Sequence, residues 1–543
     1  MLRGDVFQAI ALVCLGVTPA ALYGQARVLT WHNDNARTGQ NLQERILTPL
    51  NVRTSSFGKL FVIGDKGGPQ GTLDGKVDAQ PLYVPSVAIP GQGVHNVLYV
   101  MTEHDTAYAF DADNGAMLWK VSTLGANESP SDIRGCGQVV PEIGITATPA
   151  IDLSQGPNGA IYVVAMSKDQ FGSYHQRLHA LDPTTGRDLF GGPREIQATY
   201  AGAGVENTFL PGQHKERAAL LTLNGVVYTA WSSHCDIPSY TSWVIGYKES
   251  NLQQVGVLNL TPNGNDGAIW AAGAGPAADS SGNFYVLTGN GSFDTTLDAA
   301  GFPIHGDYGN SFVKISTTGG SLRVVDYFAM FNAVSESAAD ADLGSGGPML
   351  LPPLNDPNGH PVTLLAGAGK DGNVYVVDVN PGRMGKFNSA SNAIYQQMTG
   401  AVPYGVWSSP AWFNGHMYYG AVGSPLKAFE FARGVFETVP TSQTTIGFAY
   451  PGTTPSISAN GTSDAIVWAV ESNEGLPAAV LHAYEAGDLS RELYNSNQAA
   501  GGRDHFGAGN KFIVPTIANG KVYVGTTNGV GVFGLLHRNV QGR

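Results

Sequence analysis

The sequence predicts an all-β protein, an eight-bladed β-propeller of four-stranded blades whose ring is closed by an N-terminal strand. A four-part strand pattern that recurs along the chain, a composition rich in glycine and proline, and an N-terminal stretch resembling an unpaired outer strand lead to this prediction. Of the 543 residues, 71 are Gly and 31 are Pro, while only 13% are charged. This composition favours short strands joined by tight turns over surface helices, and a hydrophobic content of 43% argues against a disordered chain.

The recurring pattern opens with a proline just before a short apolar strand. A proline at the first residue of a strand costs no hydrogen bond of the sheet. The opening prolines are Pro81, Pro149, Pro276, Pro348, Pro410, Pro455 and Pro515, and Ala219 stands where an eighth would fall. Four short strands per unit, at a period of about 60 residues, are typical of propeller blades. We count eight such units.

The second strand of each unit is apolar, often aromatic, and follows a turn. These strands are expected at 98–100, 161–163, 227–229, 284–286, 363–367, 417–419, 466–468 and 522–524, with 374–376 as the next strand of the fifth unit. A third strand ends in an acidic turn, as in 109–115, and a fourth follows at 117–120. The last unit, 512–536, has only three strands. We therefore expect 58–62 to complete it, which removes an exposed sheet edge.

The first residues predict an export signal. Arg3 supplies a positive end, 9–17 form an apolar stretch, and a small-x-small cleavage site ends at Ala26. A membrane anchor is the alternative, but the apolar run is too short to span a bilayer. The bulky Val13 before Cys14 disfavours a lipid anchor. We expect a secreted or periplasmic protein whose mature chain has no membrane span.

Three parts follow from these predictions: a signal peptide at 1–26, an N-terminal collar with the closing strand at 27–76, and the propeller at 77–543. With 30 basic and 43 acidic residues the formal net charge is −13, which argues against nucleic-acid binding through phosphates. The mature chain keeps Cys136 and Cys235. Whether these two pair depends on geometry that the sequence leaves open.

Two copies of the acidic turn carry a longer motif. The stretch 109–119 reads Ala-x-Asp-x-x-x-Gly-x-x-x-Trp, and 180–186 repeats it up to the glycine. The motif resembles the blade motif of the quinoprotein alcohol dehydrogenases, whose propellers carry pyrroloquinoline quinone (PQQ). In that family it pins neighbouring blades together, and non-catalytic scaffold propellers share it. The resemblance therefore implies the fold more strongly than the activity.

One residue just past the second strand of each unit is a candidate for the functional face. These residues are His104, Lys168, His234, Asn290, Lys370, Gly423, Glu471 and Asn528. Equivalent positions in a ring of blades lie on one face, so polar side chains from several blades can converge near the central channel. On this basis His104, His234 and Glu471 are candidate cofactor contacts. The alternative is that such turns simply favour polar residues.

The resemblance also implies a site in the fourth and fifth units. In the family, an Asn in a Thr/Ser-Gly-Asn turn binds the metal ion beside the quinone, and Asn290 matches it. Trp270 matches the Trp that forms the floor under the cofactor, although a core position is the alternative. Asp340 matches the catalytic base, and Asp342 matches the second metal-binding Asp of lanthanide-type members. Lys370 matches the basic residue that contacts the quinone. Such a site combines a base, a polarising cation and a hydride acceptor.

The chain departs from the family pattern in three ways. It has no adjacent Cys pair, and Ala339 precedes Asp340 where the family has a Trp. The early-blade stretch 167–171 has no Glu for the metal, for which Asp169 or Glu142 are the available substitutes.

Two further polar stretches have simpler alternatives. The loop after Asn290 gathers oxygen-bearing and imidazole side chains that suit Ca²⁺ or else form a solvated loop: Asp294, Asp298, His305 and Asp307. The stretch 31–41 is polar and elaborate, and we expect it to be a packed collar.

We therefore expect an exported quinoprotein-like oxidoreductase that takes hydride from an alcohol or sugar onto PQQ beside Ca²⁺ or a lanthanide. Because no Cys-x-x-Cys-His haem motif occurs, electrons would leave to a separate acceptor. The alternative is a non-catalytic propeller that binds a protein or carbohydrate.

Overall fold

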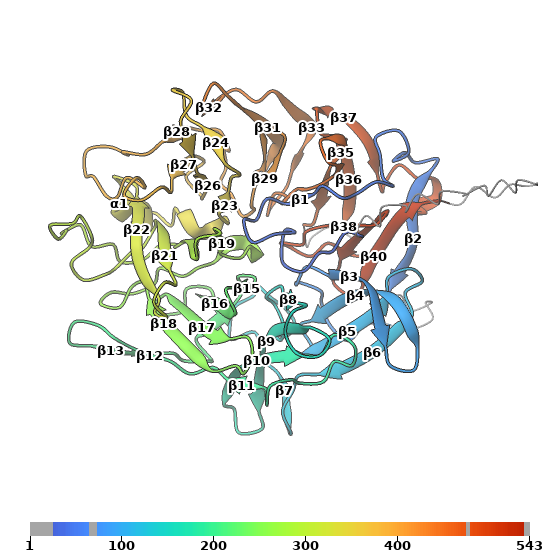
Figure 1. The fold of residues 1–543 in the computed structure, drawn as a ribbon, viewed down its shortest axis with the longest axis horizontal. Helices are drawn as coiled ribbons and strands as arrows, with labels where there is room; N and C mark the ends of the chain where they lie inside the picture. Colours follow the sequence, from blue (N-terminus) through green and yellow to red (C-terminus); the bar gives the residue numbers. More distant parts are fainter. Residues whose placement is uncertain (1–24, 65–72, 474–477, 537–543) are drawn as a thin grey trace, which may run out of the picture.

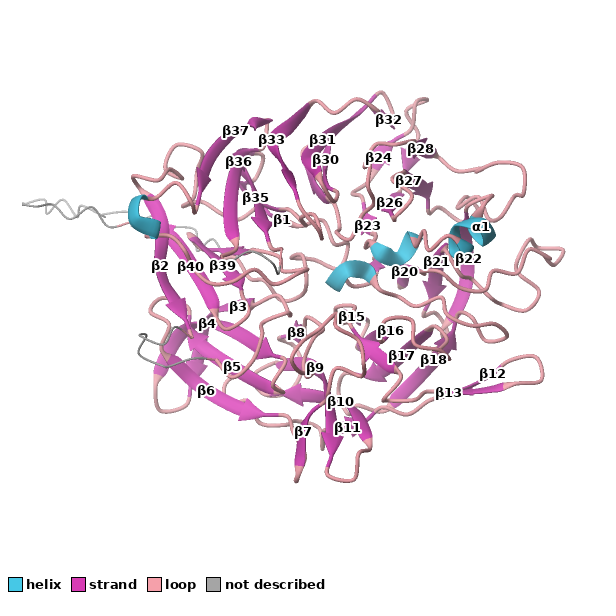
Figure 2. Ribbon diagram, turned by 180° about the vertical axis from the view of Figure 1, so that it is seen from behind, coloured by secondary structure: helices cyan, strands magenta, loops and turns pink. Residues whose placement is uncertain are grey.

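The computed structural model describes residues 25–64, 73–473 and 478–536, and these residues form an eight-bladed β-propeller (Figure 1). The prediction of an all-β propeller of four-stranded blades is thereby confirmed. Helical structure in the described residues is limited to one short helix and three single turns, drawn in cyan in Figure 2. They are α1 (Ala333–Ala338), η1 (Ala271–Gly273), η2 (Leu343–Ser345) and η3 (Ala500–Gly502).

Each blade is an antiparallel sheet whose first strand lies innermost. Blade 1 is β3 (Leu82–Ile89), β4 (Gly93–Thr102), β5 (Thr106–Asp111) and β6 (Met117–Ser122). Blade 2 is β8 (Ala150–Asp152), β9 (Ala160–Asp169), β10 (Tyr174–Leu181) and β11 (Arg194–Glu195), with β7 (Glu128–Pro130) added beside β9. Blade 3 is β14 (His214–Glu216) and β15 (Leu221–Leu223), both paired with β16 (Val226–Ser233), then β17 (Trp243–Lys248) and β18 (Gln254–Asn259). Blade 4 is β19 (Ala277–Ala278), β20 (Asn283–Leu287), β21 (Ser311–Ser316) and β22 (Arg323–Ala329).

The second half of the ring repeats this arrangement. Blade 5 is β23 (Met349–Leu350), β26 (Leu364–Ala368), β27 (Val374–Asp378) and β28 (Gln396–Met398). Blade 6 is β29 (Ala411–Phe413), β30 (His416–Gly420), β31 (Ser424–Ala432) and β33 (Ser442–Phe448), with β32 (Val435–Phe436) at the end of β31. Blade 7 is β34 (Ser456–Asn460), β35 (Ser463–Glu471), β36 (Val480–Glu485) and β37 (Asp488–Asn495). Two hairpins lie outside the blades: β12 (Thr199–Ala201) with β13 (Glu206–Thr208), and β24 (Leu354–Asn355) with β25 (Pro361–Val362).

The N-terminal part of the chain closes the ring, as the sequence predicts. Blade 8 is β38 (Thr516–Ala518), β39 (Lys521–Gly525), β40 (Val530–Leu535) and, as its outer strand, β2 (Phe57–Ile63). Phe57 is fully buried, and its ring lies 5.0 Å from that of Tyr494 and 5.5 Å from that of Trp468, both in blade 7. This apolar contact fixes the closing strand against the neighbouring blade, since aromatic rings bury a large area.

The recurring motif pins one blade to the next. The Trp119 indole of blade 1 donates to the carbonyl of Pro183 in blade 2 at 3.0 Å. A Cβ on Gly186 would lie 2.8 Å from the Trp119 ring, and the φ of +70° at Gly186 is one that other residues rarely adopt. Glycine is therefore required where the indole packs, which explains why the motif couples a Trp to the glycine of the next copy.

The segment 28–41 runs around the inner strands and hydrogen-bonds to all eight blades. Its partners in blades 1 to 8 are Tyr83, Ile151, Thr222, Ala278, Leu350, Trp412, Ile457 and Ile517. Part of this segment, β1 (Gln40–Asn41), pairs in parallel with β34. The fully buried Arg37 donates to the carbonyls of Trp31, Leu220 and Pro276. The polar character of 31–41 is thus used in packing.

Candidate functional site

A small cavity lies on the ring axis, where the connections between successive blades meet. Its volume is about 70 Å³. Six of its lining residues come from six different blade-to-blade connections: Gln138, Trp270, Asp342, Trp407, Tyr450 and Phe512. A seventh, Arg217, lies between β14 and β15 of blade 3. Lys370 and Asp236 line it from the turns after β26 and β16. One face of the ring therefore gathers side chains from most blades.

An ion cluster stands beside this cavity. The Lys370 Nζ lies 2.7 Å from Asp340 Oδ1 and 2.6 Å from Asp342 Oδ2. The Asn290 side-chain amide donates to Asp340 Oδ1 at 2.7 Å, and the Asn290 backbone N–H donates to Asp342 Oδ1 at 2.6 Å. The structure thus brings together four of the residues singled out by the sequence, from blade 4, blade 5 and the connection between them.

The Thr-Gly-Asn turn after β20 explains how Asn290 reaches the cluster. The buried Thr288 hydroxyl ties the turn by donating to the Tyr308 carbonyl at 2.5 Å. A Cβ on Gly289 would lie 2.6 Å from Asp342 Oδ1 and 2.8 Å from the Trp270 indole. Only glycine lets the carboxylate and the indole approach this closely.

Asn310 supports the same cluster from the position just before β21. It is fully buried, its side-chain oxygen accepts from the Leu343 backbone N–H at 2.9 Å, and its amide nitrogen donates to Asn290 Oδ1 at 3.3 Å. Asn310 therefore fixes both the turn that carries Asn290 and the η2 turn that follows Asp342.

Burial and charge act in opposite directions within the cluster. Burial raises the pKa of Asp342, although Lys370 and the Asn290 N–H both favour its ionised form. Burial opposes the charge of Lys370, but the Asp342 and Asp340 carboxylates outweigh it and raise the pKa of the lysine. Lys370 is therefore a permanent cation at neutral pH.

The two carboxylates differ in position. The side chain of Asp342 is 8% exposed and lines the cavity, whereas that of Asp340 is 74% exposed. Asp340 also has a φ of +57°, and Asp236, Ala272 and Phe512 at the cavity have φ values of 52°, 51° and 67°. Non-glycine residues in this region store strain, which clusters at functional sites.

Trp270 and Trp407 give the cavity aromatic walls. Trp270 is 8% exposed, and its nearest neighbours include the Gly289 turn. Lys370 Nζ lies 5.8 Å from the Trp407 ring centroid, and Trp407 in turn packs edge-on against Tyr450 at 5.5 Å. The cluster is therefore flanked by aromatic rings.

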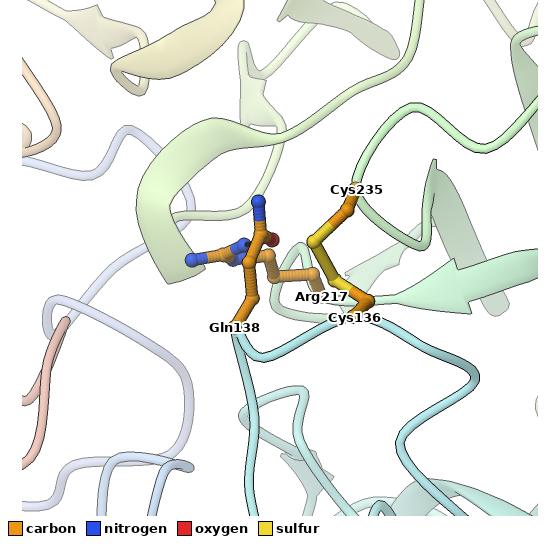
Figure 3. The surroundings of a disulfide bond; sticks show 4 residues. All are labelled: Cys136, Gln138, Arg217 and Cys235. Atoms are coloured by element: carbon orange, nitrogen blue, oxygen red, sulfur yellow. Dashed lines mark hydrogen bonds between the residues drawn. A yellow bond between two sulfur atoms is a disulfide. The ribbon is translucent and has the colours of Figure 1, made fainter.

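A disulfide joins two of the loops that border the cavity (Figure 3). Cys136, in the connection before β8, is bonded to Cys235, in the turn after β16, across 99 residues of sequence. Next to it, Arg217 donates to Gln138 Oε1 at 2.8 Å, and the Arg217 guanidinium lies 4.1 Å from the Phe512 ring centroid. The sequence left this pairing open.

Of the other three candidate cofactor contacts, His104 and Glu471 bond to partners outside the cluster. His104 Nδ1 lies 2.8 Å from Glu142, and Glu471 lies 2.9 Å from His482. His234 is buried beside the disulfide, and burial lowers its pKa to about 3. Neither bond leads to the Lys370 cluster. Of the polar residues expected to converge on the functional face, Asn290 and Lys370 are therefore the two that meet in it.

The residues predicted from the sequence did not include Arg217, Gln138, Trp407, Tyr450 and Phe512. A usable signal was present in the repeats, because several cavity residues lie two to four positions before the opening proline of a unit. They are Arg217 before Ala219, Ala272 before Pro276, Ser345 before Pro348, Trp407 before Pro410 and Phe512 before Pro515.

Other features of the described residues offer less chemistry. In the loop after Asn290, Asp294 and Asp298 accept from backbone N–H groups of their own loop. A larger cavity of about 660 Å³ lies between blades 3 and 4 at the opposite end of the strands, and Lys248 is its one charged lining residue. No helix in the described part of the chain is long and apolar enough to cross a membrane.

The architecture is similar to that of solved quinoprotein enzymes. Quinohemoprotein alcohol dehydrogenase from Comamonas testosteroni superposes with a TM-score of 0.58 at 15% identity, over 96% of this chain and 83% of that one. Quinohemoprotein alcohol dehydrogenase ADHIIG from Pseudomonas putida HK5 gives 0.58 at 15% identity, over 94% and 80%. No family model matches the chain, and no curated protein matches its sequence. At this identity the likeness concerns the fold, and for the fold it confirms the resemblance that the sequence indicated.

Proposed function

We propose that this propeller is a quinoprotein-like oxidoreductase that transfers hydride from an alcohol or sugar hydroxyl to PQQ. The observation that carries the proposal is the ion cluster of Asn290, Asp340, Asp342 and Lys370 beside Trp270, on the axis of the ring. The sequence resemblance points to the same five residues. The shared architecture with two quinohemoprotein alcohol dehydrogenases adds support.

The side chains around the cavity fit the chemistry of PQQ, a flat aromatic tricarboxylate that carries a quinone. Arg217 and Lys370 supply positive charge for carboxylate or quinone oxygens. Trp270 and Trp407 supply aromatic surfaces for a flat ring. The cavity of about 70 Å³ is smaller than the roughly 300–1,000 Å³ of most ligand pockets, so entry requires lining side chains to move.

The chain's own residues provide the proton chemistry. PQQ, when bound, supplies the two-electron acceptor that amino-acid side chains lack. A carboxylate of the cluster accepts the hydroxyl proton of the substrate. Asp342 is better placed for this role than Asp340, because Asp342 lines the cavity while Asp340 is largely exposed. Lys370 holds the carboxylate in position and neutralises part of its charge.

The same proposal includes export and a separate electron acceptor. The predicted signal peptide, 1–26, lies almost entirely outside the described residues, so secretion rests on the sequence alone. Ala26, the last residue of the predicted signal peptide, is buried, and its backbone N–H donates to Asn519 of blade 8 at 3.1 Å. Cleavage on the N-terminal side of Ala26 would preserve this contact.

Titration of the purified mature protein with PQQ tests the proposal. We expect one equivalent to bind, measured by calorimetry and by quenching of tryptophan fluorescence, in parallel samples with Ca²⁺, with La³⁺ and with EDTA. Arg217→Ala and Asn290→Ala should each weaken binding at least tenfold. The control variant is Arg177→Ala, because Arg177 lies in blade 2 away from the cavity residues, and it should bind PQQ as the wild type does. If PQQ does not bind under any of the three conditions, the oxidoreductase proposal is wrong.

A scaffold that binds a protein or carbohydrate is the second candidate. Large apolar side chains are exposed on the loops of the same face, with Phe171 at 85% and Tyr404 at 77%. Such residues are typical of docking surfaces when they gather in patches. A chain that binds no PQQ but retains its fold would favour this function.

A further inference from the structure

The position between the carboxylates of the cluster is occupied by the ammonium group of Lys370. Its Nζ lies 2.7 Å from Asp340 Oδ1 and 2.6 Å from Asp342 Oδ2, distances typical of strong charge-assisted hydrogen bonds. The lysine side chain is only 19% exposed. A cation that the protein itself supplies therefore sits where the resemblance places a metal ion.

The oxygen atoms expected to bind a metal are already in use. Asp342 accepts from Lys370 through Oδ2 and from the Asn290 backbone N–H through Oδ1. Asn290 turns its NH₂ group toward Asp340, and its oxygen accepts from Asn310 at 3.3 Å. A hard cation such as Ca²⁺ needs six to eight oxygen ligands, so it would have to break most of these bonds.

The third carboxylate that a metal site would need is engaged elsewhere. Glu142 lies 2.8 Å from His104. Asp169 accepts from the backbone N–H groups of Phe171 and Ser173 at 2.9 and 2.8 Å. Among the described residues, no group of three or more His, Cys, Asp or Glu side chains has a metal-binding arrangement. The donor set does not fit the expected Ca²⁺ or lanthanide.

We propose that the Lys370 ammonium is the resident cation of this site and that it excludes divalent and lanthanide ions. Its single positive charge is tethered and balances part of the charge of two carboxylates. A divalent ion bound in addition would place two positive centres within contact distance of each other, at a cost that rises as water is excluded. The expectation that the enzyme is active without a metal rests on the proposed function. The exclusion of metal ions by Lys370 does not depend on that function.

Terbium luminescence tests the exclusion directly, because Tb³⁺ bound beside Trp270 and Trp407 is sensitised by their indoles. We expect Lys370→Met to bind one Tb³⁺ at least tenfold more tightly than the wild type. Adding Asp342→Asn to that variant should abolish the tight site. Lys370→Arg, which keeps the charge, should behave as the wild type does. Circular dichroism and thermal unfolding establish that each variant is folded.

Two results would overturn the proposal. One is a wild type that binds Tb³⁺ or Ca²⁺ as tightly as Lys370→Met in a way that requires Asp342. The other is a folded Lys370→Met variant that gains no affinity. Metal analysis of wild-type protein purified from Ca²⁺- or La³⁺-supplemented cultures gives a second measurement that needs no variant. We expect less than about 0.1 equivalent, and one equivalent that Asp342→Asn removes would contradict the proposal.

The titration with PQQ separates this inference from the proposed function. PQQ binding in EDTA supports both. Absence of PQQ binding under every condition rejects the oxidoreductase, while the terbium measurement still decides whether Lys370 excludes metal.

Discussion

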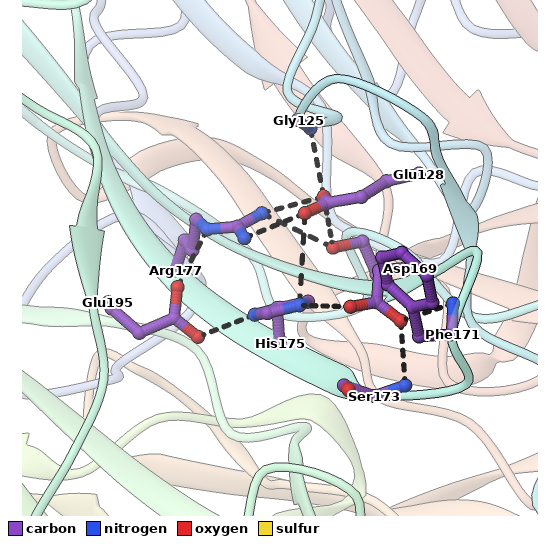
Figure 4. Close-up of polar contacts among 9 residues, drawn as sticks. Gly125, Glu128, Asp169, Phe171, Ser173, His175, Arg177 and Glu195 are labelled. Atoms are coloured by element: carbon purple, nitrogen blue, oxygen red, sulfur yellow. Dashed lines mark hydrogen bonds and ion pairs between the residues drawn. The ribbon is translucent and has the colours of Figure 1, made fainter.

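Two ion clusters in this propeller use the same ingredients, basic groups held among carboxylates, and differ in what surrounds them. One is the Lys370 cluster on the ring axis. The other lies in blade 2 (Figure 4), where Arg177 forms two bonds of 2.7 and 2.8 Å to Glu128 and one of 2.7 Å to Glu195. In blade 2, His175 adds a bond of 3.0 Å to Glu195.

The blade 2 cluster joins strands of a single sheet. Glu128 lies in β7, Arg177 and His175 in β10, and Glu195 in β11, so the charges link the added strand β7, across β9, to the outer strands β10 and β11. Glu128 also accepts from Gly125 and Ser167, which leaves both of its oxygens bonded within the blade. This cluster is a clamp within one blade, and none of its residues lines the axial cavity.

The axial cluster joins two neighbouring blades and the connection between them, and it stands at a cavity. Asp342 and Lys370 both line it, together with aromatic rings from other blades. The comparison shows that charge pairing alone does not identify a site. What distinguishes the axial cluster is its origin in two blades and the connection between them, together with its contact with a cavity.

The largest expected effect is the loss of turnover when a carboxylate of the axial cluster is replaced. Asp342→Asn should lower kcat/KM of the PQQ-loaded protein by about 10²–10⁴-fold, because a positioned base contributes that much. Asp340→Asn should cost less than tenfold. Steady-state assays with an alcohol and an artificial electron acceptor measure both, with Arg177→Ala as the control that keeps full activity. A larger loss in Asp340→Asn would instead assign the base as the sequence resemblance does.

Stability should respond most to the blade 2 clamp. Arg177→Met leaves the Glu128 carboxylate, whose side chain is 7% exposed, without its main partner. We expect the free energy of unfolding to fall by about 3 kcal/mol, at the low end for a broken buried pair because the site is partly solvated. Chemical denaturation measures it. Arg177→Lys retains the charge but not the bidentate geometry, and it should recover part of the loss.

The sequence was sufficient to predict the propeller but not the whole site. The blades were predictable because proline-led strands, acidic turns and glycines recur from unit to unit. The strand that contains Phe57 was predictable because the last blade lacked its fourth strand. Asn290, Asp340, Asp342 and Lys370 could be found because each follows a recognisable local motif. Arg217 and the Cys136–Cys235 bond could not, since closure of the ring, and no local pattern, brings those residues together.

The disulfide provides the next test, because it borders the axial cavity and not the clamp. Cys136→Ser with Cys235→Ser should lower the free energy of unfolding by about 2–3 kcal/mol, since the bond closes a long loop in the unfolded chain. The variant should also bind PQQ several-fold more weakly, because Gln138 and Arg217 lose the restraint next to them. Calorimetry with and without a reductant measures both changes. Equal PQQ affinity in the oxidised and reduced protein would show that the bond serves stability alone.

The smallest expected effect is on the pH dependence of the free energy of unfolding, to which the two clusters should contribute with opposite signs. Hydrogen bonds from Arg177 lower the pKa of Glu128 from its ordinary 4.5 to about 2, so its stabilisation is complete above pH 4.5 and is lost as the pH falls toward 2. Allowing for solvent screening, this amounts to about 1–2 kcal/mol. Burial raises the pKa of Asp342, so that carboxyl contributes stability at low pH and loses it as the pH rises. In unfolding experiments between pH 2 and 6, Glu128→Gln should flatten the acid loss, whereas Asp342→Asn should steepen it. If both substitutions changed the slope of the unfolding free energy against pH in the same direction, the pKa values of Glu128 and Asp342 would not be shifted in opposite directions as we infer.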